Sequence, residues 1–137
     1  MNEIRALMER DEYAKHSFIE LTDVGPGRAK ASMKIRKEHL NGLGGVHGAA
    51  IFTLADFVFA AAANAHGTVA VAINVSISYL RPAAGEMLHA EGVEIARSRS
   101  LASYTVRVTD DQQQLVAIFQ GMVFRKPDPI PTAVSQA

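Results

Sequence analysis

One acidic residue lies where a charge is energetically unfavourable. Asp56 is the only formally charged residue between Glu38 and Arg81, and its neighbours in the chain are mostly apolar. Burial of an unpaired carboxylate is penalised heavily, and Asp is also a poor helix former, so this position needs an explanation. Two explanations are open. Asp56 is either a structural carboxylate that accepts hydrogen bonds from a cap or a partner chain, or a base or nucleophile in a site.

A glycine-rich loop at 41–45 precedes this apolar segment, and His47-Gly48 comes shortly after the loop. The first N–H groups of a helix lack internal partners and lie at the positive end of its dipole, so they can stabilise an oxygen that becomes negative during reaction. Gly48 would let a ligand approach such a group. Asn41 offers an amide that could orient a carbonyl or a water, although Asn-Gly also marks ordinary turns. His47 is more typical of a cap or a packed side chain, and we assign it no proton transfer.

The elements that must position these residues follow from the hydrophobic pattern. Apolar residues at helical spacing predict a short helix within 2–16, capped by Asn2. The segments 18–24 and 28–36 flank Gly-Pro-Gly, and the second alternates between apolar and polar residues, which predicts a β-hairpin. The apolar residues of 46–65 lie on every side of a helical projection, so we expect a buried helix there.

The second half of the chain has the period of β-strands. From Val69 to Tyr79 apolar residues alternate with small or polar ones, and three further β-rich runs follow at 87–96, 101–109 and 115–125. The alternation changes phase near Gly92, which predicts a bulge. About six strands and one wholly apolar helix favour an α+β fold in which an antiparallel sheet curls around the helix.

We expect a single domain over 1–137, with the N-terminal helix at 1–16 and a flexible, proline-containing tail at 126–137. Of the 137 residues, 48% are apolar, and Lys plus Arg equal Asp plus Glu at 14 each. This balance excludes a global field that would attract nucleic acid or an anionic membrane. The absence of cysteine excludes disulfides and thiolate chemistry, and the N-terminus lacks a signal peptide, so we expect a cytoplasmic protein.

Helix geometry separates the two candidate groups. Asp56 lies eight residues beyond Gly48, which places its Cα roughly 12 Å along the helix axis at 1.5 Å per residue. If both groups act on one carbonyl, they must come from two helices, as a twofold axis would provide. An exposed sheet edge also favours a dimer, formed by edge pairing or helix contact. The predicted site therefore spans a subunit interface, with attack by Asp56 or by a water that it activates.

Four motifs, by their order and spacing, resemble the hot-dog-fold acyl-CoA thioesterases of phenylacetate degradation: Asn41-Gly42-x4-His47-Gly48, Leu54-Ala55-Asp56, Asn64-x2-Gly67 and Tyr79-Leu80-Arg81-Pro82. The resemblance extends from about Glu12 to Arg125. It implies a hot-dog fold and hydrolysis of an acyl-CoA, with Asp56 as the catalytic carboxylate, Gly48 as the carbonyl-polarising amide and Asn41 as the positioning amide. Where the family commonly has a second glycine after His-Gly, this chain has Ala49, which leaves the acyl preference open.

Coenzyme A carries phosphates, so the resemblance also implies cations at the mouth of the site. We assign substrate-binding roles to His47, Arg81, Arg97 and Arg99, with Arg125 as a further candidate; the alternative for the arginines is a solvated turn. The acyl group would contact the helix face that carries three phenylalanines: Phe52, Phe57 and Phe59. Coenzyme A is part of the substrate, and we expect no cofactor and no metal.

Two other functions stay open. One is a non-catalytic acyl-CoA-binding protein or sensor on the same fold, because a fold does not fix a function. The other is a thioester hydratase or dehydratase, for which His47 is badly placed relative to Asp56. No nucleophile elbow, HExxH pair or phosphate-binding loop is present in the sequence. We expect a homodimer that pairs further into a tetramer.

Overall fold

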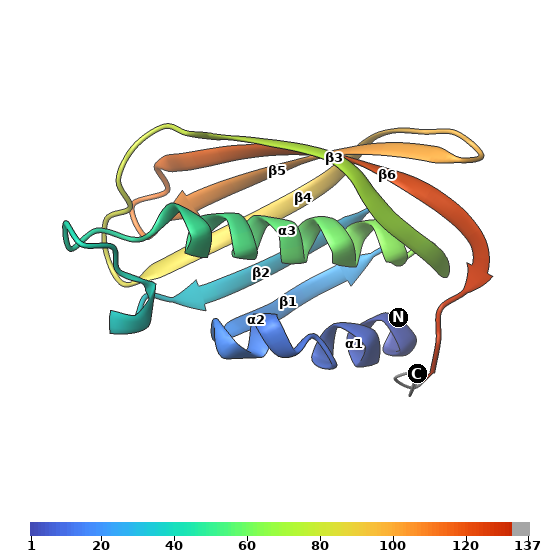
Figure 1. Ribbon diagram of the computed structural model, residues 1–137, viewed down its shortest axis with the longest axis horizontal. Coiled ribbons are helices and arrows are strands. Elements are labelled where there is room, and N and C mark those ends of the chain that lie inside the picture. The colour runs from blue at the N-terminus through green and yellow to red at the C-terminus, as the bar shows by residue number, and fades with distance from the viewer. Residues whose placement is uncertain (133–137) are drawn as a thin grey trace.

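Six strands form one antiparallel sheet in the order β1-β2-β4-β5-β6-β3, and one long helix lies across it (Figure 1). The computed structural model describes residues 1–132. The strands are β1 (Ile19–Gly25), β2 (Arg28–Lys34), β3 (Thr68–Tyr79), β4 (Met87–Arg97), β5 (Leu101–Asp110) and β6 (Leu115–Pro129). The helices are α1 (Asn2–Glu9), α2 (Glu12–His16), the short 3-10 helix η1 (Lys37–His39) and α3 (Gly48–Asn64).

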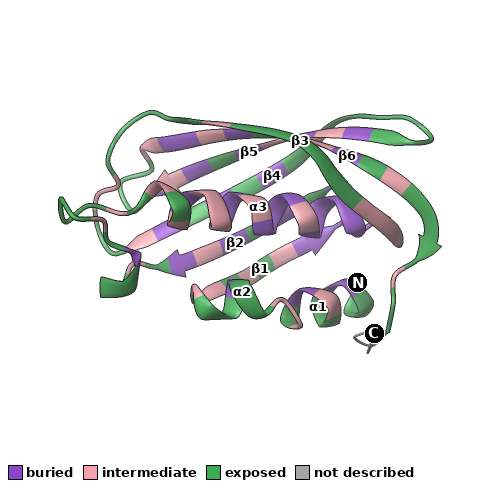
Figure 2. Ribbon diagram, viewed as in Figure 1, coloured by how far each residue is buried: buried purple, intermediate pink, exposed green. Residues whose placement is uncertain are grey.

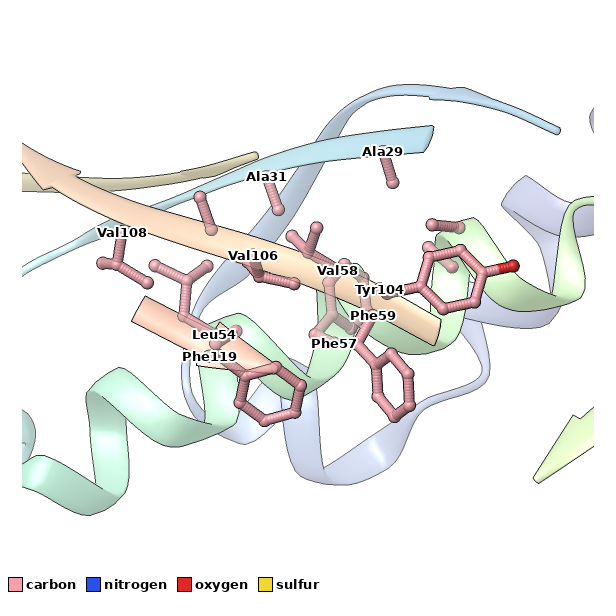
Figure 3. Packing of buried hydrophobic residues seen from close by; sticks show 14 of the residues in the cluster. Ala29, Ala31, Leu54, Phe57, Val58, Phe59, Tyr104, Val106, Val108 and Phe119 are labelled. Carbon is pink, nitrogen blue, oxygen red and sulfur yellow. The ribbon is translucent and has the colours of Figure 1, made fainter. Parts of the chain in front are cut away.

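The core lies between α3 and the sheet. Leu54 and Val58 of α3 are completely buried, and they belong to one apolar cluster with Val106 and Val108 of β5 and Phe119 of β6 (Figure 3). Burial of each such side chain contributes about 1.5–3 kcal/mol relative to exposure. The expected α+β architecture, an antiparallel sheet wrapped around one buried helix, is confirmed and is the hot-dog fold.

The predicted β-hairpin is confirmed, with its second strand ending at Lys34. Gly27 in the turn has φ +75°, a conformation that glycine adopts without strain. Its N–H donates to the carbonyl of Ala62 at 3.2 Å, so the tip of the hairpin is tied to α3.

The N-terminal segment differs from the single helix expected. It forms two helices, α1 and α2, that lie beside β1 (Figure 1). Asp11 breaks the segment because its side chain accepts the N–H of Ala14 at 3.0 Å, which is the geometry of an N-cap. The residue that precedes α1 is Met1, and Asn2 does not act as a cap.

The irregularity expected near Gly92 occurs in β4 but further along the strand. Both registers of β4 run through Gly92 without a shift, and the irregularity lies between Glu94 and Ala96. A Cβ at position 92 would lie 2.7 Å from Cγ1 of Val58. Gly92 therefore faces α3 and gives the helix room to approach, which the strand pattern alone does not reveal.

Strand β3 is an edge strand, and within residues 1–132 its one hydrogen-bonded neighbour is β6. Most of its residues are exposed, including Val71 and Ile73 (Figure 2). The strand β6 continues to Pro129, so residues 126–129 of the expected flexible tail belong to this strand, and Pro129 pairs with Thr68. Residues 133–137 of that tail lie outside the described residues.

Candidate active site

The glycine-rich loop before α3 is closed on itself. The carbonyl of His39 accepts the N–H of His47 at 2.7 Å, and Leu40 forms an isolated β-bridge with Val46. The loop therefore leaves and returns at nearly the same place, directly before the first turn of α3.

Asn41 serves this closure with its own side chain. Its Oδ1 accepts the N–H groups of Leu43 at 2.9 Å and Gly45 at 3.2 Å. The side-chain oxygen of Asn41 therefore stabilises the turn, as the Asn-Gly pair also suggests. Its Nδ2 has no acceptor within residues 1–132, so it is the part of the amide that could donate to a ligand.

The N-terminus of α3 presents one N–H without a partner. His47 is the N-cap, and its Nδ1 accepts the N–H of Ala49 at 2.9 Å. The N–H of Gly48 makes no hydrogen bond within the described part of the chain. It lies at the positive end of the helix dipole, where it can polarise a carbonyl oxygen.

Tyr79 is a further residue of this site. Its hydroxyl donates to the carbonyl of Gly48 at 3.0 Å, and a Cβ at position 48 would lie 3.2 Å from its ring. The ring therefore leaves little room for a side chain at position 48. The sequence contains Tyr79 in a recognisable motif, but no local signal indicates that it packs 31 residues away.

A cavity of about 550 Å³ opens at this end of α3. It is lined by the loop, the first turns of α3 and the segment after β3: Asn41, Leu43, Gly45, Val46, Gly48, Ile51, Tyr79, Leu80, Arg81, Pro82 and Ala83. The structure thus brings Asn41, Gly48 and Arg81 together. The guanidinium of Arg81 donates to Oε1 of Gln114 at 2.9 Å, which restrains it on the wall of the cavity.

Two carboxylates, at the end of β5 and in the turn that follows it, hold the loop 80–86 that forms this wall. Asp110, 1% exposed, accepts the N–H of Ala84 at 3.0 Å. Asp111 accepts the N–H groups of Glu86 at 2.7 Å and Met87 at 3.1 Å. Burial opposes ionisation of Asp110, but backbone N–H donors outweigh it and hold its pKa below the ordinary value.

Asp56 lies outside the cavity that contains Asn41 and Gly48. It is half-buried on α3, outside the cavity lining, and no hydrogen-bond donor in residues 1–132 reaches its carboxylate. Burial raises the pKa of Asp56, and the negative charge of Asp11 raises it further. Gly48 and Asp56 of one chain both lie on α3, so the helical rise separates their Cα atoms by roughly 12 Å along the helix axis.

The candidate arginines do not form one cluster within a chain. Arg97 interacts with Nδ1 of His66 at 3.1 Å and with Glu94 at 3.7 Å, next to the C-terminus of α3. Arg125 donates to a backbone carbonyl of the β4–β5 turn at 2.6 Å. Arg81 lies at the opposite end of α3, roughly 25 Å away by the rise of 17 helical residues. Arg99 lies in the β4–β5 turn, and its side chain has no partner within residues 1–132.

Glu94 is the centre of a polar group at this second end. Its Oε1 accepts from Nε2 of His66 at 2.7 Å and from the hydroxyl of Tyr104 at 2.9 Å. Burial would raise the pKa of Glu94, but these donors lower it below the usual value. Burial, and then Glu94, raise the pKa of Tyr104, whose hydroxyl points out of the core cluster (Figure 3). Oε2 of Glu94 also lies 3.7 Å from Nε of Arg97, so the carboxylate and the guanidinium form an ion pair.

The three phenylalanines of α3 are not equivalent. Phe59 is a core residue, 2% exposed. Phe57, 5% exposed, lines a separate cavity of about 330 Å³ between the N-terminal helices and β1, which contains neither Asn41 nor Gly48. Phe52 is partly exposed and packs edge-on against Phe119 at 5.6 Å between ring centroids. Within residues 1–132, no group of three potential metal ligands occurs and no helix has the length and apolarity of a membrane span.

Comparison with known proteins agrees with this geometry. The model of the thioesterase superfamily matches residues 43–117. The acyl-coenzyme A thioesterase PaaI of Escherichia coli K12 is 35% identical over 88% of this chain and 86% of its own. Human acyl-coenzyme A thioesterase 13 is 30% identical over 67% of this chain and 68% of its own. The structure of E. coli PaaI, from the phenylacetic acid degradation operon, superposes with a TM-score of 0.90 at 33% identity and covers 95% of each chain. This chain therefore belongs to the thioesterase superfamily and is a thioester hydrolase with the hot-dog fold.

Proposed function

We propose that the protein hydrolyses an acyl-CoA to the free acid and coenzyme A. The observation that carries the proposal is the unpartnered N–H of Gly48 at the N-terminus of α3, where Gly48 and Asn41 line one cavity. A donor fixed in the backbone needs no reorganisation to stabilise the oxygen that becomes negative when a thioester carbonyl is attacked. The relatives named as acyl-coenzyme A thioesterases support the choice of carrier.

The carboxylate of the reaction comes, in this proposal, from a second subunit. Asp56 is too far along α3 to serve Gly48 of its own chain, and it has no hydrogen-bond donor within residues 1–132. The free edge of β3 provides a place for twofold pairing, and it carries exposed apolar side chains such as Ile73. Antiparallel pairing there would reverse one α3 relative to the other and create two equivalent sites. The expected pairing of dimers into a tetramer stays a prediction.

Two chemical routes use the same groups. In the first, the carboxylate of Asp56 attacks the carbonyl carbon, the thiolate of coenzyme A leaves, and water hydrolyses the resulting anhydride. In the second, Asp56 takes a proton from a water that attacks the carbonyl carbon directly. In both, the N–H of Gly48 stabilises the oxyanion, and Asn41 positions the carbonyl or the water. A raised pKa suits a general base, because it increases the affinity of Asp56 for the proton that it accepts.

The antiparallel orientation of the two α3 helices would also place cations near the phosphates of the substrate. It would bring the β4–β5 turn of one subunit toward the Gly48 end of α3 in the other. Arg99 is the best candidate cation there, since Arg97 is already paired with Glu94. Arg81 lines the cavity and His47 adjoins it as the N-cap of α3, and we place both near the thioester of the substrate. We place the reaction in the cytoplasm, with which the cysteine-free composition is compatible.

A free-thiol release assay over a panel of acyl-CoAs tests the proposal. Asp56→Asn removes the base or nucleophile and is expected to abolish release, whereas Asp128→Asn makes the same change at an exposed position and should leave it intact. Activity that survives Asp56→Asn would remove the mechanism. If the wild type binds acyl-CoA but releases no thiol from any member of the panel, the alternative of a non-catalytic sensor is correct instead.

A further inference from the structure

His39 is a buried histidine to which the proposed reaction gives no role. Its side chain lies at the end of η1, and the residue is 4% exposed. Nδ1 accepts the N–H of Arg36 at 3.0 Å, and Nε2 lies 2.9 Å from the carbonyl oxygen of Ser17. Because a backbone N–H can only donate, Nδ1 must be the acceptor, and Nε2 carries the proton that is donated to Ser17. Both ring nitrogens of the neutral histidine are therefore used.

The partner of Nε2 lies 22 residues away in sequence, in the segment that joins α2 to β1. The ring of the next residue, Phe18, packs edge-on against His39 at 6.1 Å between centroids. The guanidinium of Arg36 lies over the same Phe18 ring at 4.2 Å. Ser17, Phe18, Arg36 and His39 thus form one anchor, which we call the His39 anchor.

The His39 anchor is joined directly to the loop that carries the two candidate donors. The carbonyl of His39 accepts the N–H of His47 at 2.7 Å. Asn41 is the first residue inside the closed loop, and Gly48 is the first residue after it. A displacement of His39 therefore moves both ends of the loop together.

We propose that His39 is a positioning residue for thioester hydrolysis, which acts by fixing the loop 40–47 so that Asn41 and Gly48 point into the cavity. The inference rests on the function proposed above. Donors that stabilise a transition state act only over short distances, and a misplacement of about 1 Å can lower a rate by about a hundredfold. Loss of the anchor should therefore lower kcat, while substrate binding along the rest of the cavity is retained.

Two substitutions separate the hydrogen bonds of the ring. His39→Asn keeps an acceptor near the position of Nδ1, and so keeps the bond to Arg36, but it loses the donor to Ser17. His39→Gln keeps a donor near the position of Nε2. We expect His39→Asn to lower kcat about tenfold or more with little change in KM, and His39→Gln to retain most of kcat. His16→Gln is the matched control, because His16 is exposed and precedes Ser17.

Hydrogen exchange provides a second readout that does not depend on activity. The amides of 40–48 should exchange faster in His39→Asn than in His39→Gln, while those of β4 to β6 remain unchanged. Equal kcat in all variants, or a loss of kcat that only follows the folded fraction, would overturn the inference. If the wild type releases no thiol from any thioester, the proposed function fails and the catalytic role of His39 fails with it. If the wild type is active and the loop exchanges equally in both variants, the inference alone fails.

Discussion

A site shared between two subunits can be tested by mixing two inactive variants. Asp56→Asn removes the carboxylate and leaves the N–H of Gly48 intact. Gly48→Val leaves Asp56 intact but places a branched side chain where a Cβ alone would lie 3.2 Å from the ring of Tyr79. Each variant alone should form homodimers in which both sites carry one lesion. Neither should release thiol from an acyl-CoA above the background rate.

The expected recovery follows from the symmetry. In a heterodimer, one site combines the intact Gly48 of the first chain with the intact Asp56 of the second, and the other site carries both lesions. Random 1:1 mixing makes half of the dimers heterodimers, and each of them has one active site of two. The mixture should therefore recover about a quarter of wild-type activity, and purified heterodimers about half.

The assay is thiol release after the two variants have been unfolded together and refolded, or co-expressed with different tags. Gly42→Val is the matched control for the glycine substitution, because a Cβ at position 42 meets no atom within 4 Å and Gly42 does not line the cavity. Gly42→Val alone reports whether a branched residue close to α3 is itself harmful. If heterodimers of Asp56→Asn and Gly48→Val form but stay inactive while each chain is folded, both groups act within one chain and the geometric reasoning is refuted.

Three further predictions concern single variants. Because the charge of Asp11 helps to raise the pKa of Asp56, Asp11→Asn should move the acidic limb of the kcat/KM profile to lower pH; an unmoved limb would contradict this coupling. Gly92→Ala, whose Cβ would meet α3 at 2.7 Å, should lower the free energy of unfolding by about 1–3 kcal/mol in urea titrations. Gly42→Ala, with no atom within 4 Å, is its control. Arg99→Ala should raise KM for an acyl-CoA but not for the matching N-acetylcysteamine thioester, which lacks phosphates; equal effects on both would exclude phosphate binding.

The elements of the fold could be predicted because their signals are local. Alternation in 28–36 and the Gly-Pro-Gly turn indicate a hairpin whatever surrounds them, and the apolar residues on all sides of 46–65 indicate a buried helix. Asp11 shows the limit of such patterns, because a single strong N-cap divides a segment whose apolar spacing is continuous. Gly92 shows another, since the need for glycine comes from Val58 on a different element.

The site could be predicted only in part, for the same reason. Asn41, Gly48 and Asp56 are recognisable from residue type, spacing and family resemblance. Tyr79 depends on a contact across 31 residues. The turn that contains Asp110 resembles an ordinary polar turn in the sequence, yet its carboxylate is buried and binds a distant loop. Long-range pairing decides these roles, and a single sequence does not encode it in any local pattern.

The way in which the loop 80–86 is held has a consequence for how this enzyme could change its substrate. The carboxylates of Asp110 and Asp111 bind the backbone N–H groups of this loop, which every residue except proline possesses. Side chains on the cavity wall, such as those of Leu80 and Ala83, can therefore be replaced without loss of these bonds. On the proposed function, the shape of this wall and its contacts with the substrate depend on different atoms. Mutation of these side chains can then change substrate preference while the carboxylates preserve the shape of the wall.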